Sequence, residues 1–375
     1  MVAIGLRSII TVAMDIIKAT RDFEKWLGGC LKIVKPDLDY KHEQMRVDPF
    51  LYFRATYYRW VQHWLEHLPE LARVGETLVV GDLHLENFGT WRDEEGRLIW
   101  GVNDFDEAHP MSFANDLVRL AVSAELAARS SETFAINGDE ICREILAGYQ
   151  ESLERRGEPF VLMEKHPLLR KMALQDLRQP ATFWSHLEEK TAEPTEKIPG
   201  PVIKALREIT PQEADLARRV IRTPKGLGSL GRQRFLALGE WEGGMIAREA
   251  KAVAPSALVW AMGKPPAQGN AWLETTVRCA VRCSDPFYKV HRNWLVRRLA
   301  PDCSRIDFNE LAKHENRALL LHCMGAETAN IHLGAKKARR KIRRDLEKLP
   351  KHWLRHATKK MLTLCLADWK KFKKG

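Results

Sequence analysis

The spacing of hydrophobic residues divides the first half of the chain into helical and extended stretches. Apolar residues recur at three- and four-residue spacing over 5–28 and over 48–68, which predicts two amphipathic helices. The segment 77–84 (TLVVGDLH) has a continuous apolar run typical of a buried strand, and the turn DEEGR between short apolar runs predicts a hairpin over 91–100. Helical spacing returns from 112 to about 190, so this half is predicted to be mainly helical.

Glycine turns separate short apolar runs after residue 222. The stretch 222–253 is predicted to form strand, glycine turn, strand, Gly-Gly turn and strand. The remaining predicted elements are a linker or surface loop over 191–201, a helix over 201–221, a helix over 270–283, a strand pair ending in WLVRRL (294–299), and helices from 308 onward.

Composition and charge narrow the class of protein. The 375 residues are 45% hydrophobic, which suits one large domain or two joined lobes and excludes a disordered or collagen-like chain. Lys and Arg number 60 against 49 acids, and the formal charge of +11 favours phosphate, nucleic-acid or anionic membrane partners without choosing among them.

The cysteines and the N-terminus bear on the compartment. Seven Cys show no framework spacing, and Cys279 and Cys283 have no His pair to complete a zinc site, so we expect free buried thiols in a reducing compartment. The apolar stretches at the N-terminus fall short of the ~20 residues of a membrane span, and no cleavable signal is evident. We therefore expect a cytoplasmic protein without a transmembrane segment.

The main chemical signal is GDLHLENFG followed by VNDFDEA. Asp82 and Asn87 lie five residues apart on a loop that leaves a buried strand, and Asp104 ends the strand that returns through the hairpin. Phosphoryl transfer needs a carboxylate to accept or orient the proton of the attacking hydroxyl, and an amide oxygen and a further carboxylate to hold magnesium. We predict Asp82 as the base and Asn87 and Asp104 as metal ligands, with Asp106 as a possible second carboxylate.

A competing interpretation of GDLH is the opening motif of metallophosphoesterases, in which Asp and His bind a metal. That fold requires further metal-ligand motifs downstream. No GNH motif is found, because Gly269 and Asn270 are followed by Ala271. The phosphotransferase interpretation is therefore favoured.

A glycine-rich segment, GLGSLG, lies far downstream between strand-like runs. Gly226, Gly228 and Gly231, with Ser229 between them, would let the backbone approach phosphate oxygens. Lys251, twenty residues after Gly231 on a predicted strand, would neutralise the α- and β-phosphates. Three further residues matter here: Glu274 on the next predicted helix is the expected ion-pair partner of this lysine, and Lys225 and Arg248 are competitors for the lysine role.

Segment order suggests a rearranged fold. In an ordinary kinase the glycine loop precedes the catalytic loop, whereas Gly226 here follows Asp82 by 144 residues. The expected fold class is α+β: a bilobal protein-kinase-like fold, circularly permuted, with a mostly helical large lobe and a small antiparallel-sheet lobe. The expected segments are a helical extension (1–40), a helical catalytic lobe (41–221), a nucleotide-binding small lobe (222–302) that enters a hinge near Pro301, a helical return (303–335) and a basic helical tail (336–375).

Two resemblances follow from these motifs. GDLHLEN and NDFDEA resemble the catalytic and metal loops of aminoglycoside and choline phosphotransferases, although Val80 stands where a His is usual and Asp106 where a Gly is usual. The blocks RVDPFLYFRATYYRW, GDLHLENFG, NDFDEAHP and GLGSLGRQRFLAL resemble a bacterial family known as domain of unknown function 2252, which looks like a distant member of the kinase-like superfamily. This resemblance implies ATP and Mg²⁺ as cofactors and leaves the acceptor undefined.

Other residues and functions remain open at this stage. Arg54 would bind a phosphate, anchor Asp82 or form a surface or capping ion pair. Asp116 is expected to N-cap a helix, and the resemblance to antibiotic kinases implies that it also steadies the catalytic loop. His84 is expected to pack or to form a hydrogen bond within that loop. The tail is either a solvated helix face or a docking arm for nucleic acid or another anionic partner. The alternatives to phosphoryl transfer are a non-catalytic ATP-binding regulator, adenylate transfer and a nucleic-acid adaptor.

Overall fold

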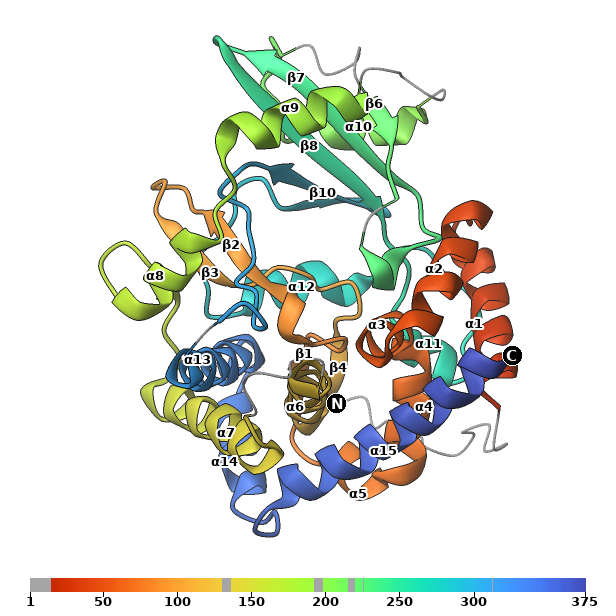
Figure 1. Ribbon diagram of the computed structural model, residues 1–375, viewed down its shortest axis with the longest axis vertical. Helices are drawn as coiled ribbons and strands as arrows, with labels where there is room; N and C mark the ends of the chain where they lie inside the picture. The colour runs from red at the N-terminus through yellow and green to blue at the C-terminus, as the bar shows by residue number, and fades with distance from the viewer. Residues whose placement is uncertain (1–14, 130–135, 192–197, 215–219, 225, 312) are drawn as a thin grey trace.

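The computed structural model of the protein describes residues 15–129, 136–191, 198–214, 220–224, 226–311 and 313–375. The fold is mixed α+β, and its strands pair antiparallel throughout the described residues. A five-stranded sheet occupies the top of Figure 1, and most of the helices lie below it. Its strands, in spatial order, are β6 (Val220–Arg222), β7 (Arg234–Trp241), β8 (Gly244–Ala252), β10 (Trp294–Leu299) and β9 (Lys289–His291).

Each face of this sheet has its own apolar core. Along β7 the side chains alternate, as in any strand, so Phe235 and Leu236 point to opposite faces. Phe235 joins Val202 and Leu206 of α10 (Gly200–Arg207) on one face. Leu236 joins Phe183 of α9 (Pro180–Thr191) on the other. The sheet is thus covered by one helix on each side.

A larger apolar core holds the helical part together. It draws residues from both ends of the chain: Phe23 and Trp26 near the N-terminus and Met361 and Phe372 near the C-terminus are buried in it. The remaining helices are α1 (Ile16–Cys30), α2 (Lys35–Val47), α3 (Pro49–Ala55), α4 (Tyr57–His67), α5 (Pro69–Ala72), α6 (Ala114–Arg129), α7 (Gly138–Arg155), α8 (Pro167–Gln175), α11 (Ala257–Ala261), α12 (Ala271–Cys279), α13 (His314–His332), α14 (Ala338–Leu346) and α15 (Trp353–Lys374), with short 3-10 turns at Leu85–Asn87 and Leu227–Ser229.

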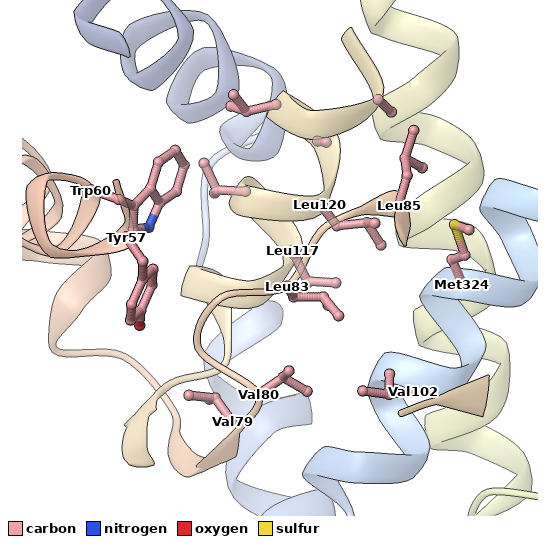
Figure 2. Packing of buried hydrophobic residues seen from close by; sticks show 14 of the residues in the cluster. Tyr57, Trp60, Val79, Val80, Leu83, Leu85, Val102, Leu117, Leu120 and Met324 are labelled. Carbon is pink, nitrogen blue, oxygen red and sulfur yellow. The ribbon is translucent and has the colours of Figure 1, made fainter. Parts of the chain in front are cut away.

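Two small sheets within the helical part carry the predicted site loops. One pairs β1 (Glu76–Val79) with β4 (His109–Ser112), and the other orders β2 (Phe88–Arg92), β3 (Leu98–Val102) and β5 (Phe160–Val161). Figure 2 shows Leu83 and Leu85, on the loop after β1, beside Leu117 and Leu120 of α6 and near Met324 of α13. The predicted hairpin is confirmed as β2 and β3, with its register running from Phe88 opposite Val102 to Arg92 opposite Leu98.

Tertiary contacts change two predicted helices. The helix expected over 48–68 is split at Thr56 into α3 and α4, because Arg119 donates from Nη2 to the carbonyl of Phe53 (3.0 Å) and Thr56 Oγ1 donates to the carbonyl of Tyr52 (2.8 Å). The helix expected over 201–221 is wrong in its second half. There α10 ends at Arg207, and Val220–Arg222 forms β6, whose apolar residues face the two cores of the sheet.

Two other expectations differ at the residue level. Asp116 lies inside the first turn of α6 and is not its N-cap; Ser112 Oγ accepts the N–H of Ala114 (3.2 Å) at that end instead.

The predicted helix over 5–28 is seen as α1 within the described residues. All seven cysteines are free thiols; four are buried as expected, whereas Cys279 is exposed and Cys283 and Cys303 are partly exposed. Within the described ranges, no helix is long and apolar enough to cross a membrane.

Candidate active site

A cleft of about 410 Å³ lies where the five-stranded sheet meets the helical part. It brings together segments that are far apart in the sequence. Its lining includes Asp82 and Asn87 from the loop after β1, Asp104 and Asp106 from the loop after β3, and the glycine-rich turn 226–229. Lys251 reaches the same place from β8, because its ammonium contacts both Asp104 and Asp106.

Buried polar groups hold the loop that carries Asp82. The carboxylate of Asp116 accepts the N–H groups of Val80 (2.7 Å) and Gly81 (3.0 Å), so this residue steadies the loop as expected. Gly81 has φ +86°, and a Cβ there would lie 2.4 Å from the carbonyl oxygen of Glu107, so a glycine is required. Asn87 closes the loop by donating from Nδ2 to the carbonyl of Asp82 (2.7 Å).

His84 has a structural place in this loop. Its Nδ1 accepts the N–H of Glu86 (3.2 Å), and the side chain is buried. Burial lowers the pKa of His84 well below its ordinary value, and Arg54 and Arg119 add to the effect. The residue is therefore a neutral loop-forming group, in agreement with the expected hydrogen-bonding role.

The carboxylate of Asp82 is bound by an arginine that the sequence analysis did not identify. Arg119 of α6 donates from Nε to Asp82 Oδ1 (2.8 Å) and also pairs with it through Nη2. The guanidinium is fully buried and lies 4.0 Å from the ring centroid of Phe53. Burial raises the pKa of Asp82 above its ordinary value, and the opposing attraction of Arg119 does not cancel this effect. The loop thus presents a carboxylate of increased basicity in a fixed position.

Asp104 and Asp106 both lie against the ammonium of Lys251. The ammonium lies 2.7 Å from Asp106 Oδ1 and 3.3 Å from Asp104 Oδ1. Burial acts to raise the pKa of Asp104, but Lys251 and Arg297 outweigh it and lower that pKa to about 2. Asp106 is nearly buried and is also paired with Arg232 (3.4 Å), whereas the side chain of Asp104 is 39% exposed. Asp104 is therefore the more accessible carboxylate.

The side-chain oxygens of Asn87 and Asp104 suit a magnesium ion whose other ligands come from a phosphate group and water. Asn87 uses Nδ2 within the loop, which leaves Oδ1 as the amide atom for a cation. With Asp104 it supplies two oxygen ligands, and Mg²⁺ in phosphate-binding sites typically takes one or two carboxylates plus substrate oxygens and water. Among the residues that the structure describes, no group of three His, Cys, Asp or Glu side chains forms a self-sufficient metal site.

The glycine-rich segment closes over the catalytic loop. Gly226 and Gly231 have φ values of +75° and +90°, which favour glycine, and residues Leu227–Ser229 between them form a 3-10 turn. A Cβ on Gly228 would lie 3.0 Å from the carbonyl oxygen of Arg54 and 3.7 Å from Asp82 Oδ2. A side chain at position 228 would therefore contact the predicted base, so the glycine lets the turn pass close to Asp82.

The expected partner of Lys251 is not the observed one. Glu274 is exposed on α12, and that helix packs against β1, β4 and α13 in the helical part, so the predicted Lys251–Glu274 ion pair is absent. Glu249, two residues before the lysine, is buried and pairs with Arg234 (2.6 Å) and Arg297 (2.8 Å). The acidic partners of Lys251 are therefore Asp104 and Asp106 themselves.

The other candidate cations are placed differently. Arg248 donates from Nε to the carbonyl of Ile209 (2.7 Å) and stacks on Phe287, which directs it away from Asp104. Lys225 lies outside the described residues. Arg232, which the sequence analysis missed, pairs with Asp106 and with Glu107 (3.2 Å). It directly follows Gly231 and lies two residues before β7 begins, and this position is the only sequence signal that could have marked it.

A second cavity of about 540 Å³ adjoins the cleft and shares Arg178 and Leu299 with it. Its walls include Leu236 of β7 and Phe183 and Leu187 of α9. The polar cleft and this more apolar cavity together suit a ligand with one charged and one flat apolar end.

One family model matches part of the chain. Residues 34–176 match the model of a family described as an uncharacterized protein conserved in bacteria, domain of unknown function 2252. The match contains the loops of Asp82 and Asp104 and ends before the five-stranded sheet. No curated protein and no solved structure matches the chain.

Proposed function

We propose that this protein is an ATP- and magnesium-dependent phosphotransferase with a circularly permuted, bilobal kinase-like fold. The observation that carries the proposal is the meeting of Asp82, Asn87 and Asp104 with Lys251 and the turn 226–231 at one cleft. A base, an amide, a metal-binding carboxylate, a phosphate-binding lysine and a glycine loop are the recurring parts of kinase active sites. The free thiols fit a reducing compartment, and we place the protein in the cytoplasm.

The five-stranded sheet would hold the nucleotide. Lys251 stands on the third strand of this sheet in chain order, as the phosphate-binding lysine of kinases does. The triphosphate would meet Lys251 and the backbone of Gly228. The adenine ring would enter the second cavity, which is lined by Leu236 and Phe183. Asn87 and Asp104 would hold magnesium, which supplies charge neutralisation at the phosphates when bound.

Asp82 would act on the acceptor. Its carboxylate accepts the proton of the acceptor hydroxyl while the acceptor oxygen forms a bond to the γ-phosphorus, and the bond from that phosphorus to the bridging oxygen breaks to release ADP. Arg119 fixes the position of the carboxylate through Oδ1. Lys251, freed from part of its contact with Asp104, would neutralise the departing phosphate oxygens.

Titration calorimetry with ATP and Mg²⁺ tests nucleotide binding. Wild-type protein is expected to bind, and Asp104→Ala to bind at least about tenfold more weakly, because it removes a metal ligand. Asp82→Asn is expected to keep the affinity and lose about 10²- to 10⁴-fold of the transfer rate, because it removes only the base. Glu347→Gln is the matched control, because Glu347 is exposed and does not line the cleft.

The nature of the transferred group is tested with labelled ATP. Incubation with cell extract should move label from the γ-position and leave label at the α-position in nucleotide. Incorporation of α-label would show adenylate transfer instead. Equal ATP binding by wild type and Asp104→Ala, or binding by neither, would overturn the proposal.

A further inference from the structure

Arginine side chains dominate the cleft. Of the described residues that line it, eight are arginines and six are acids. The acids are already engaged: Asp106 and Glu107 pair with Arg232, and Glu86 pairs with Arg54 and Arg305. The cleft therefore has a positive excess beyond its internal ion pairs, and it favours anionic ligands.

Several of these guanidinium groups have buried N–H donors without an acceptor. Among the described residues, no hydrogen-bond partner is found for Arg54 Nε, Arg232 Nε or Arg282 Nε, which are buried atoms of residues that line the cleft. An unsatisfied buried donor is costly, and native proteins seldom keep one without a bound group to meet it. Their convergence on one cleft indicates that oxygen-rich anions complete the site.

Four of the arginines form two sets, and each set is held by its own carboxylate. Arg234 and Arg297 come from the five-stranded sheet and flank Lys251 through Glu249, on the side that suits the nucleotide. Arg54 comes from α3 and Arg305 from the segment after β10, and both bind one carboxylate, Glu86, in the catalytic loop. The second set is therefore on the side of Asp82.

Arg54 is close to the chemistry. It donates from Nη1 to Glu86 Oε1 (2.9 Å), its carbonyl lies beside Gly228, and its side chain is only 13% exposed. Arg305 holds the other oxygen of Glu86 and is 52% exposed, so it faces the opening of the cleft. One carboxylate thus fixes two guanidinium forks, which together keep a net positive charge and match a phosphate group.

We propose that Arg54 and Arg305, oriented by Glu86, form the acceptor's anion subsite, so that the acceptor is an alcohol that carries a phosphate group. The inference rests on the proposed phosphoryl transfer. It excludes cationic acceptors such as aminoglycosides and choline, since these would be placed against two arginines beside Asp82. The hydroxyl group of the acceptor would reach Asp82, while the phosphate group of the acceptor would bind Arg54 and Arg305. These arginines are held by Glu86, which lies four residues after Asp82 in the same loop.

The subsite is tested with inorganic phosphate as the probe. Full-length protein is first saturated with Mg²⁺ and a non-hydrolysable ATP analogue, so that the γ-phosphate position is filled, and phosphate is then titrated by calorimetry. Wild type is expected to bind phosphate, and Arg305→Gln to bind it about tenfold more weakly or not at all. Arg305 is half exposed, so this variant should fold, and Arg54→Gln is the second variant. Arg340→Gln, an exposed arginine on α14, should behave as wild type.

Acceptor pairs provide the second arm of the test. Release of ADP is measured with two phosphorylated alcohols, glycerol 3-phosphate and glucose 6-phosphate, and with their neutral counterparts, glycerol and glucose. Kanamycin and choline are the cationic acceptors. Stimulation by a phosphorylated member, reduced in Arg305→Gln, supports the subsite. Stimulation by the cationic or neutral members alone, or phosphate binding unchanged in both arginine variants, overturns it. A loss of analogue affinity as large as the loss of phosphate affinity also overturns it, because Arg305 would then serve the nucleotide.

The two proposals fail in different ways. If wild type does not bind the ATP analogue, the proposed function fails, and phosphate titration of the free protein still shows whether Arg54 and Arg305 bind an anion. If the analogue binds and phosphate does not, the subsite fails and the phosphotransferase proposal stands.

Discussion

At the scale of single residues, the behaviour of Asp82 depends on two opposing influences. Burial in the loop disfavours the carboxylate, and Arg119 favours it. The net effect raises the pKa of Asp82, which suits a group that must take a proton in the course of a reaction near neutral pH. Arg119 is itself held under Phe53, Tyr57 and Trp60, so the position of the base depends on aromatic packing in α3 and α4.

The pH dependence of turnover tests this assignment. Only the deprotonated form of Asp82 can accept the proton, so ATP turnover should fall as the pH falls through the raised pKa of this group. Replacement of Arg119 by Gln removes the opposing attraction, so the acidic limb of the profile should move to higher pH. The measurement is the pH–rate profile of ADP release at saturating Mg-ATP.

Two controls separate this effect from a loss of structure. Circular dichroism establishes that Arg119→Gln is folded, and Asp82→Asn should show no acidic limb in its residual rate. An acidic limb that stays in place when Arg119 is replaced would contradict the proposed coupling.

At the scale of elements, α15 is a structural helix of the core. Met361, Leu362 and Phe372 are buried in the main core. The lysines of this helix, among them Lys359 and Lys370, are exposed, in agreement with the expected solvated face, and the docking role stays a prediction. Asp368 pairs with Arg59 Nε (2.6 Å) and His63 Nε2 (2.6 Å) on α4. Burial acts to raise the pKa of Asp368, but His63 and Arg59 outweigh it and lower that pKa.

Removal of this carboxylate should therefore destabilise the fold. Asp368→Ala leaves Arg59 buried without its partner, and the free energy of unfolding should fall by about 3 kcal/mol. Because the pKa of Asp368 is lowered, its contribution is present above the ordinary aspartate range and is lost as the pH falls. Urea unfolding at pH 7 and at pH 3 measures both effects, with the exposed Lys370→Ala in the same helix as the control. A loss that is equal at the two pH values would refute the ionic explanation.

The elements also show what sequence patterns can and cannot predict. The loop of Asp82 and Asn87 and the hairpin to Asp104 were predictable, because local spacing along one short segment fixes how these groups are presented. The break at Thr56 was not, because it depends on a contact from Arg119, more than sixty residues away in the sequence. Glu274 was misplaced for the same reason: its helix was assigned by order along the chain, whereas packing puts it against β4.

At the scale of the whole molecule, ion pairs join the five-stranded sheet to the helical part. Lys251 on β8 and Arg232 on the turn before β7 extend to Asp104, Asp106 and Glu107. The two parts have separate apolar cores, so these charges lie where the cores meet. A nucleotide bound there would replace some of these ion pairs. The sheet and the helical part would then each contact the nucleotide.

This arrangement predicts a specific thermal response. Mg-ATP at 100 times its dissociation constant should stabilise the wild-type protein by about 2.7 kcal/mol, because it binds only the folded state. Lys251→Met removes the cation that Asp104 and Asp106 share and leaves Asp106 only its pair with Arg232, so the free protein should melt lower. Its response to Mg-ATP should be reduced, because the phosphates lose their lysine. Melting curves over a series of Mg-ATP concentrations, repeated with EDTA, measure both changes. The exposed Lys289→Met on β9 of the same sheet should match the wild type. An undiminished shift in Lys251→Met would mean that the nucleotide binds away from the ion pairs that join the two parts.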